Sequence, residues 1–186
     1  RPDETGDALA DDELIAACSL LLFAGHETTS NLIGNGIWAL LRHPDELRRL
    51  RGEPQLIDSA VEEMLRWEAP VPFSSPRSAT QDVTLPNGCP VTAGSMVLCA
   101  YGSANIDPTE YPDAHDVRFD RLKNKHITFG MGPHRCLGSH LARRELRIAL
   151  REWHNRIPDY WLTPGHEELV YPPGLRHVKD LMLTWK

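Results

Sequence analysis

The stretch FGMGPHRCLG, residues 129–138, brings one cysteine, Cys136, through a glycine-rich segment to the start of a predicted helix. Glycines permit the tight, bulged backbone that such a segment needs. A sulfur atom at a helix N-terminus meets unpaired N–H groups and the positive end of the helix dipole, which favour the thiolate form. A thiolate held there is a nucleophile or a metal ligand, whereas a lone cysteine without these surroundings is most often an inert buried thiol.

Hydrophobic periodicity outside this stretch predicts a mainly α-helical fold with small β elements. Helices are expected over residues 11–42, 45–50, 55–67 and 138–156, where apolar side chains recur at steps of three and four. Pro70, Pro72 and Pro76 then forbid helix. Short strands are expected at 82–88 and 89–100 around the turn Pro86-Asn87-Gly88, and a β-like tail follows Pro158. Residues 104–128 lack a period, which is typical of a functional loop.

Composition narrows the functional classes. The 186 residues carry 26 acidic and 20 basic side chains, a net charge of −6, which argues against bulk nucleic-acid binding. No apolar run approaches the ~18 residues of a membrane-spanning helix. The four cysteines form no C-x-x-C pair, so neither a zinc ribbon nor a disulfide scaffold is favoured, and a reducing cytoplasmic location is expected.

The first predicted helix has a polar centre, residues 25–31, between two apolar flanks. We expect both flanks to be buried, and a buried carboxylate such as Glu27 costs several kcal/mol unless it is paired. Gly25 costs about 1 kcal/mol more in mid-helix. Both costs are understandable if another group lies against the helix at residues 25–31. Thr28 can also donate a hydrogen bond to a carbonyl of the preceding helical turn. The alternative is a helix with one face in water. A zinc-protease H-E-x-x-H motif is excluded because position 30 is serine.

Two further features concern charge. Glu63 and Arg66 are three residues apart on a predicted helix and can pair, which is usually no more than a surface salt bridge. Residues 121–156 hold nine Lys or Arg residues against Glu145 and Glu152. This segregation predicts one basic face on an acidic body, or simply a solvated helix.

Taken in order, these features resemble the cytochrome P-450 family of haem-thiolate monooxygenases, in its soluble bacterial form. Phe129-x-x-Gly132-x-x-x-Cys136-x-Gly138 matches the family's haem-binding signature. Residues 24–29, Ala-Gly-His-Glu-Thr-Thr, match its oxygen-activation segment, and Glu63-Met64-Leu65-Arg66 matches its E-x-x-R motif. Family members are about twice as long, so the resemblance implies that residues 1–186 are the C-terminal part of a single catalytic domain. This part alone is expected to be inactive.

The resemblance also implies roles for individual residues. Cys136 would be the axial ligand of haem b, and Glu27 and Thr28 would relay protons to dioxygen. Glu63 and Arg66 would form a buried structural network with Arg118. Other contacts to the cofactor would come from Gly25, Arg77, Phe129, Gly132, His134 and Gly138.

The implied activity is insertion of one atom of dioxygen into a hydrophobic small molecule. Electrons would come from a ferredoxin or flavin-type donor that docks at Arg143, Arg144 and Arg147. The implied substrate pocket consists of Leu20, Phe23, Ala24, Val71, Phe73, Ser74 and Leu175. The alternative is a haem-thiolate protein that binds or senses ligands without oxygenating them, and the Glu27–Thr28 pair argues against it. A zinc site built from Cys136, His134 and His140 is disfavoured, because His134 and Cys136 are close together in sequence and no fourth ligand is apparent.

Overall fold

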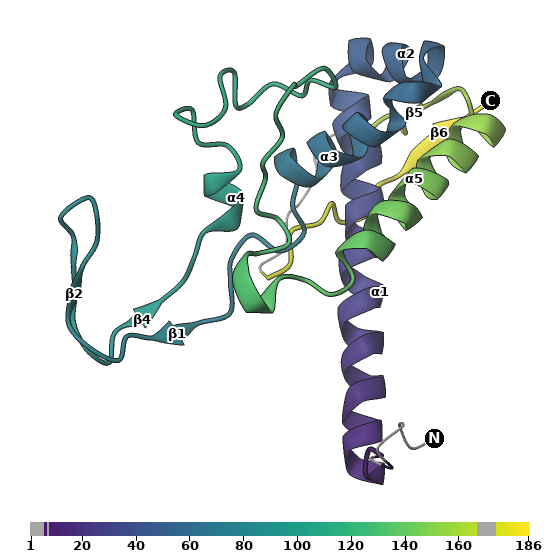
Figure 1. Ribbon diagram of the computed structural model, residues 1–186. Helices are drawn as coiled ribbons and strands as arrows, with labels where there is room; N and C mark the ends of the chain where they lie inside the picture. Colours follow the sequence, from purple (N-terminus) through teal and green to yellow (C-terminus); the bar gives the residue numbers. More distant parts are fainter. Residues whose placement is uncertain (1–5, 7, 167–173) are drawn as a thin grey trace.

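The computed structural model describes residues 6, 8–166 and 174–186, and it is mainly helical, as the sequence predicts (Figure 1). The helices are α1 (Asp11–Arg42), α2 (Pro44–Gly52), η1 (Pro54–Leu56), α3 (Ile57–Trp67), α4 (Tyr101–Ala104), η2 (Gly132–His134) and α5 (Ser139–Arg156), η marking 3-10 turns. The strands are β1 (Arg77–Ser78), β2 (Val83–Thr84), β3 (Pro90–Val91), β4 (Met96–Val97), β5 (Tyr160–Leu162) and β6 (Leu183–Trp185). The two long helices are confirmed within one residue at each end.

The ends of α1 follow from local chemistry. Ala10 occupies the N-cap position and offers no side-chain cap, but its N–H donates to the Glu13 carboxylate at 2.9 Å. Three acidic residues in the first turn also suit the positive end of the helix dipole. At the other end, Pro44 follows His43 and starts α2 at its first position, where a missing N–H costs nothing.

The core lies where the C-terminal half of α1 packs against α3 and α5. Leu40, Met64, Leu146 and Leu150 are at most 1 % exposed and belong to one apolar cluster. α1 and α3 are packed tightly at Gly36, where an added Cβ would lie 3.0 Å from the Met64 sulfur. A side chain at position 36 would therefore require the buried Met64 side chain to shift.

The N-terminal half of α1 differs from the expectation that both apolar flanks are buried. Leu20 is 65 % exposed and Phe23 is 71 % exposed. Figure 1 shows this half of α1 (purple) extending beyond the other described elements. The prediction of burial is wrong for this flank. The helical pattern identifies the apolar residues, but it does not show which other segment packs against them.

The strands of the described residues form three separate two-stranded antiparallel sheets. β2 and β3 form the hairpin predicted around Pro86-Asn87-Gly88, with Val83 opposite Val91. β1 pairs with β4, and β5 pairs with β6 near the C-terminus, where Tyr160 faces Trp185. Among the residues described, none of the helices has the length and apolar character needed to cross a membrane.

Candidate functional site

The Cys136 loop is held by backbone hydrogen bonds at both ends. The Cys136 N–H donates to the Phe129 carbonyl at 2.9 Å, and the Ser139 N–H donates to the Cys136 carbonyl at 3.3 Å. Gly130 and Gly132 take positive φ angles of 68° and 73°, which a residue with a side chain adopts only with strain. The Cys136 thiol therefore stands exposed at the start of α5, as the sequence predicts.

The residues expected to contact the cofactor differ in exposure. Gly138 and His134 are exposed, and so is Arg77 on β1. Phe129 is half-buried and packs against the apolar core. The loop thus leaves the Cys136 thiol and the His134 imidazole exposed, while Phe129 anchors it against the core.

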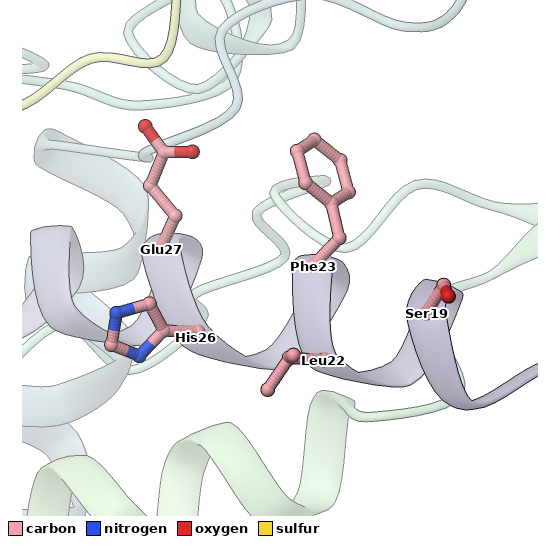
Figure 2. Close-up of a pocket in the computed structure, with 5 residues that line it drawn as sticks. All are labelled: Ser19, Leu22, Phe23, His26 and Glu27. Carbon is pink, nitrogen blue, oxygen red and sulfur yellow. The ribbon is translucent and has the colours of Figure 1, made fainter.

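The polar centre of α1 is also open. The Thr28 hydroxyl donates to the Ala24 carbonyl at 2.7 Å, which is the back-bonding expected from the sequence. A Cβ added at Gly25 would meet no atom within 4 Å. Glu27 and Phe23 project to the same side of the helix (Figure 2) and border a shallow hollow of about 360 Å³. Gly25, Glu27 and Thr28 are therefore accessible to a group that lies against α1.

The residues expected to line a substrate pocket fall into separate places. Leu20, Phe23 and Ala24 are exposed on α1. Phe73 borders a second hollow of about 410 Å³, together with Trp67, Ile106 and Arg176. Val71 and Leu175 are half-buried and do not border it.

Ser74 is only 8 % exposed, and its hydroxyl accepts the Cys99 N–H at 2.9 Å. The Ser74 N–H in turn donates to the Cys99 carbonyl at 2.9 Å. Ser74 therefore joins two chain segments, and the expectation that it faces a substrate stays a prediction.

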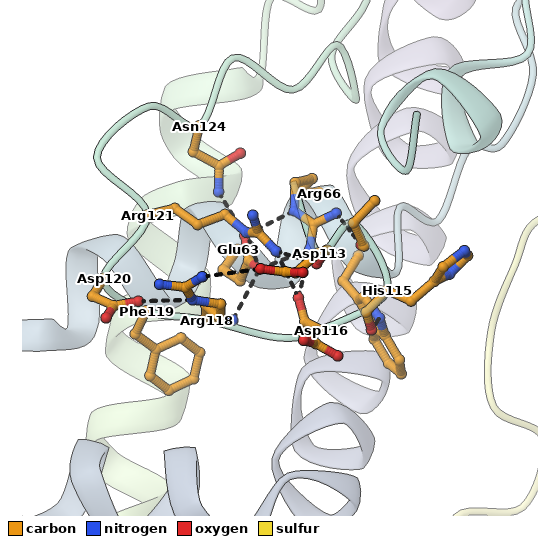
Figure 3. A network of polar contacts seen from close by, with 12 residues as sticks. Glu63, Arg66, Asp113, His115, Asp116, Arg118, Phe119, Asp120, Arg121 and Asn124 are labelled. Carbon is orange, nitrogen blue, oxygen red and sulfur yellow. Dashed lines mark hydrogen bonds and ion pairs between the residues drawn. The ribbon is translucent and has the colours of Figure 1, made fainter. Parts of the chain in front are cut away.

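Glu63 is the centre of a buried polar network (Figure 3). Its carboxylate accepts two hydrogen bonds from the Arg66 guanidinium, at 2.7 and 2.8 Å, and both side chains are 0 % exposed. The Asn124 side-chain amide donates a further hydrogen bond to Glu63 at 3.0 Å. Burial opposes ionisation of Glu63, but the bonds from Arg66 and Arg121 outweigh it and lower the pKa of the carboxyl. Glu63–Arg66 is thus a buried pair, not a surface salt bridge.

The third member of this network is Arg121, and the prediction of Arg118 is wrong. The Arg121 Nε donates to Glu63 at 2.9 Å, and its side chain is 8 % exposed. Arg118 reaches Glu63 only through its backbone N–H, at 3.0 Å. The Arg118 guanidinium points to Asp113 and Asp120 and is 45 % exposed. In an aperiodic loop, the side-chain direction does not follow from the spacing.

The two buried guanidiniums also order the long loop after α4. Arg66 donates to the carbonyls of Asn105, Ala114 and Asp116. Arg121 donates to the carbonyls of Pro112 and Asp113 at 2.8 and 2.7 Å. The absence of periodicity in residues 104–128 is explained, because these side chains replace the hydrogen bonds of a regular element.

Asn105 is a structural residue that sequence reasoning missed. It is fully buried, and its amide donates to the Thr128 hydroxyl at 2.8 Å and accepts the Ile127 N–H at 2.8 Å. The Thr128 hydroxyl in turn donates a hydrogen bond to the Leu65 carbonyl at 2.7 Å. The available signal is the segment Ser103-Ala104-Asn105, which is typical of the bacterial branch of the family but does not indicate the partners of Asn105.

A second cluster lies beside the first, on Glu62. Its carboxylate accepts two bonds from Arg143, at 2.6 and 2.8 Å, and pairs with His126 at 3.0 Å. Burial raises the pKa of Glu62, but the hydrogen bonds from His126 and Arg143 outweigh it and lower the pKa to about 2. The Arg143 guanidinium lies 4.6 Å from the centre of the Phe129 ring.

This cluster corrects the expected basic face of α5. Arg143 is not displayed to a partner, because its side chain is 16 % exposed and engaged with Glu62. Arg147 is partly exposed and pairs with Asp58 at 2.7 Å. Arg144 is exposed, as expected. The turn-by-turn rotation of the helix places neighbouring arginines on different faces.

No zinc site is formed by the residues named for one. In the part of the chain that the structure describes, no group of three or more His, Cys, Asp or Glu side chains is placed to hold a metal ion. The combination of Cys136, His134 and His140 is therefore not supported.

Replacing the two loop arginines in turn tests the assignment of the network. Arg121→Ala should lower the free energy of unfolding by about 3 kcal/mol or more, because it leaves part of a buried charge unpaired. Arg118→Ala is the matched control, and it should cost less than about 1 kcal/mol because exposed ion pairs contribute little. Urea unfolding measures both, and a larger loss in the Arg118 variant would contradict the assignment.

Comparison with known proteins places this arrangement in a family. The family model described as Cytochrome P450 matches residues 2–153. The cytochrome P450 monooxygenase PikC of Streptomyces venezuelae is 45 % identical over 186 residues, which cover 99 % of this chain and 44 % of that protein. The vitamin D(3) 25-hydroxylase of Pseudonocardia autotrophica is 45 % identical over 169 residues, 91 % of this chain and 42 % of that protein.

Solved structures agree with this match. The structure of P450BioI in complex with an acyl carrier protein aligns with a TM-score of 0.90 and 40 % identity, and the alignment covers 98 % of this chain and 47 % of that one. The chain thus spans about half the length of the relatives it matches. Members of the family bind haem b through a cysteine thiolate. The family match and these similarities show that the chain belongs to the cytochrome P450 family.

Proposed function

We propose that this chain is the C-terminal part of a haem-thiolate monooxygenase, with Cys136 as the axial ligand. The observation that carries the proposal is the exposed Cys136 thiol, fixed at the start of α5 by the bond from its N–H to the Phe129 carbonyl. Relatives named as monooxygenases and hydroxylases support the reaction class. The open, apolar N-terminal half of α1 supports the view that the complete domain holds further elements.

The residues present fit a flat, mostly apolar cofactor with acidic edges. A Cβ at Gly132 or Gly25 would meet nothing within 4 Å, so both backbones leave room beside the exposed thiol and on α1. Leu137, next to the thiol, is 90 % exposed and offers an apolar contact. Arg77 and His134 are exposed and suit the carboxylates of the haem edge. The bound haem would supply the redox chemistry and activate dioxygen at its iron.

The protein's part on the α1 side is to bring protons. The Thr28 hydroxyl donates a hydrogen bond to the Ala24 carbonyl, so its oxygen lone pairs remain able to accept a hydrogen bond from water. Glu27, one residue earlier and exposed, can exchange protons with solvent. A carboxyl and a hydroxyl joined by water suit proton relay to dioxygen. On the other side, Phe129 anchors the thiol loop and keeps water from its inner face.

The substrate class follows from the lining of α1 and of the second hollow. Leu20, Phe23, Ala24 and Phe73 are apolar or aromatic, which favours a hydrophobic small molecule. Relatives are named for different compounds, among them vitamin D(3) and mycinamicin IV, so family membership does not identify one substrate.

Four free thiols among the described residues agree with a reducing, cytoplasmic location.

Electrons would arrive from an acidic ferredoxin or flavin-type donor at Arg144 and Arg147. Both lie within the first turns of α5 that follow the Cys136 loop, and Arg144 is exposed. A basic surface on the helix that follows the Cys136 loop would steer an acidic partner to that side of the molecule.

Salt dependence of reduction tests this docking site in the complete protein. Arg144→Gln should slow reduction by the acidic donor at low ionic strength and flatten its salt dependence, because a steering charge is lost. Arg156→Gln, at the far end of α5, is the control and should change little. Reduction that is insensitive to salt in the unchanged protein would contradict the docking site.

The absorption spectrum of the reduced, carbon-monoxide-bound complete protein tests the axial ligand. A strongly red-shifted Soret band is expected, because thiolate ligation produces it. Cys136→Ser should abolish that band, whereas Cys99→Ser, which changes another exposed thiol, should preserve it. A red-shifted band in the Cys136 variant would refute the proposal.

Removing the Thr28 hydroxyl tests the proton relay. Thr28→Ala should lower the product formed per electron by about tenfold or more, with a matching rise in hydrogen peroxide, because proton delivery slows. Haem content should not change. Ser30→Ala is a matched control, since that hydroxyl also bonds back along α1, to the His26 carbonyl at 2.8 Å. Equal coupling in the Thr28 variant and the unchanged protein would assign no relay to Thr28 and favour a ligand-binding protein.

A further inference from the structure

Arg143 stands apart from the other arginines of α5 because its charge is directed inward. Its Nε and Nη2 atoms donate to the Glu62 carboxylate at 2.6 and 2.8 Å. Its Nη1 donates back along the helix to the Ser139 carbonyl at 3.3 Å, toward the N-terminal turn of α5. The neighbouring Arg144 is exposed. A cation has therefore been placed at the end of α5 where Cys136 lies.

The two groups that Arg143 touches besides Glu62 are both bonded to Cys136 through the backbone. The Phe129 ring lies 4.6 Å from the guanidinium carbon, and the Phe129 carbonyl accepts the Cys136 N–H at 2.9 Å. Ser139, whose carbonyl accepts from Arg143, donates its own N–H to the Cys136 carbonyl at 3.3 Å. The guanidinium thus packs against both ends of the cysteine loop.

Glu62 and His126 hold this cation in one place. Glu62 lies on α3 and pairs with His126 at 3.0 Å, and the His126 side chain is only 2 % exposed. The ring of His126 also packs against Phe129, with centres 6.1 Å apart. The Glu62–Arg143 pair is therefore a fixed dipole, with its positive end on Phe129 and its negative end on α3. Partial burial makes such a dipole effective, because water screens it poorly.

We propose that the Glu62–Arg143 pair sets the electrostatic environment of the Cys136 sulfur, with Arg143 as a positioning residue that acts through Phe129. The inference rests on the proposed haem-thiolate function. Reduction of a haem-thiolate centre adds negative charge, so a cation fixed behind the thiolate favours the reduced form and raises the reduction potential. Glu62 limits this effect by compensating the cation.

Two variants that remove opposite charges test the inference in the complete, haem-loaded protein. Arg143→Gln should shift the reduction potential to a more negative value, because it leaves the Glu62 charge uncompensated. Glu62→Gln should shift it to a more positive value, because Ser139 and Phe129 still hold the guanidinium. The double variant should lie between them, close to the unchanged protein. A spectroelectrochemical titration measures all three.

Controls separate tuning from a structural role. Arg156→Gln, which removes an exposed charge at the far end of α5, should leave the potential unchanged. Arg143→Lys, which keeps the charge, should remain closer to the unchanged protein than Arg143→Gln does. If the Glu62 and Arg143 variants shift in the same direction, or neither shifts at full haem content, the inference is overturned. If Arg143→Gln binds no haem, the Glu62 variant decides: a positive shift supports the inference, and no shift overturns it.

The same samples reveal a failure of the proposed function itself. An unchanged protein without the thiolate Soret band would refute Cys136 as the axial ligand, and the inference with it. An unchanged protein with that band, but without opposite shifts in the variants, would refute the inference alone.

Discussion

The buried negative charge of Glu63 constrains the rest of the described structure. An unpaired carboxylate at that depth would be destabilising by several kcal/mol, so the fold must bring donors to it. Arg66 supplies them from the same helix, and Arg121 and Asn124 supply them from a loop about sixty residues further on. Because that loop leads directly into residues 129–138, pairing Glu63 also determines where the cysteine loop begins.

The adjacent carboxylates of Glu62 and Glu63 on α3 hold different segments in place. Glu63 orders the loop before the cysteine, whereas Glu62 reaches His126 and, on α5, Arg143. The segment carrying Phe129 and Cys136 is therefore held on both sides by buried or half-buried ion pairs anchored on one helix. Such pairs add orientation as well as energy, since bidentate guanidinium–carboxylate contacts fix two planes relative to each other. This explains how a loop rich in glycine can present a thiol in one defined position.

Under the two proposals, the neighbouring arginines Arg143 and Arg144 give α5 an inner and an outer role. Arg143 is turned toward the cysteine loop and Arg144 toward solvent, so electron transfer and tuning of the thiolate would use different side chains. The division also explains why a count of positive charge in residues 121–156 overstates the basic surface. Of that charge, Arg121 and Arg143 are used inside the molecule.

Local pattern accounts for the helices at 11–42 and 138–156, the hairpin at Val83 and Val91, and the cysteine loop. Each depends on hydrogen bonds between residues close in sequence, so composition and spacing suffice. The E-x-x-R pair belongs to the same class, because its members are one helical turn apart. Other features depend on long-range packing alone. It pairs Glu63 with Arg121 instead of Arg118, and it buries Asn105. It also directs Arg143 toward the interior and leaves Leu20 and Phe23 exposed. Those outcomes depend on which segments meet in space. In a loop without a repeating pattern, the sequence does not show in which direction each side chain points.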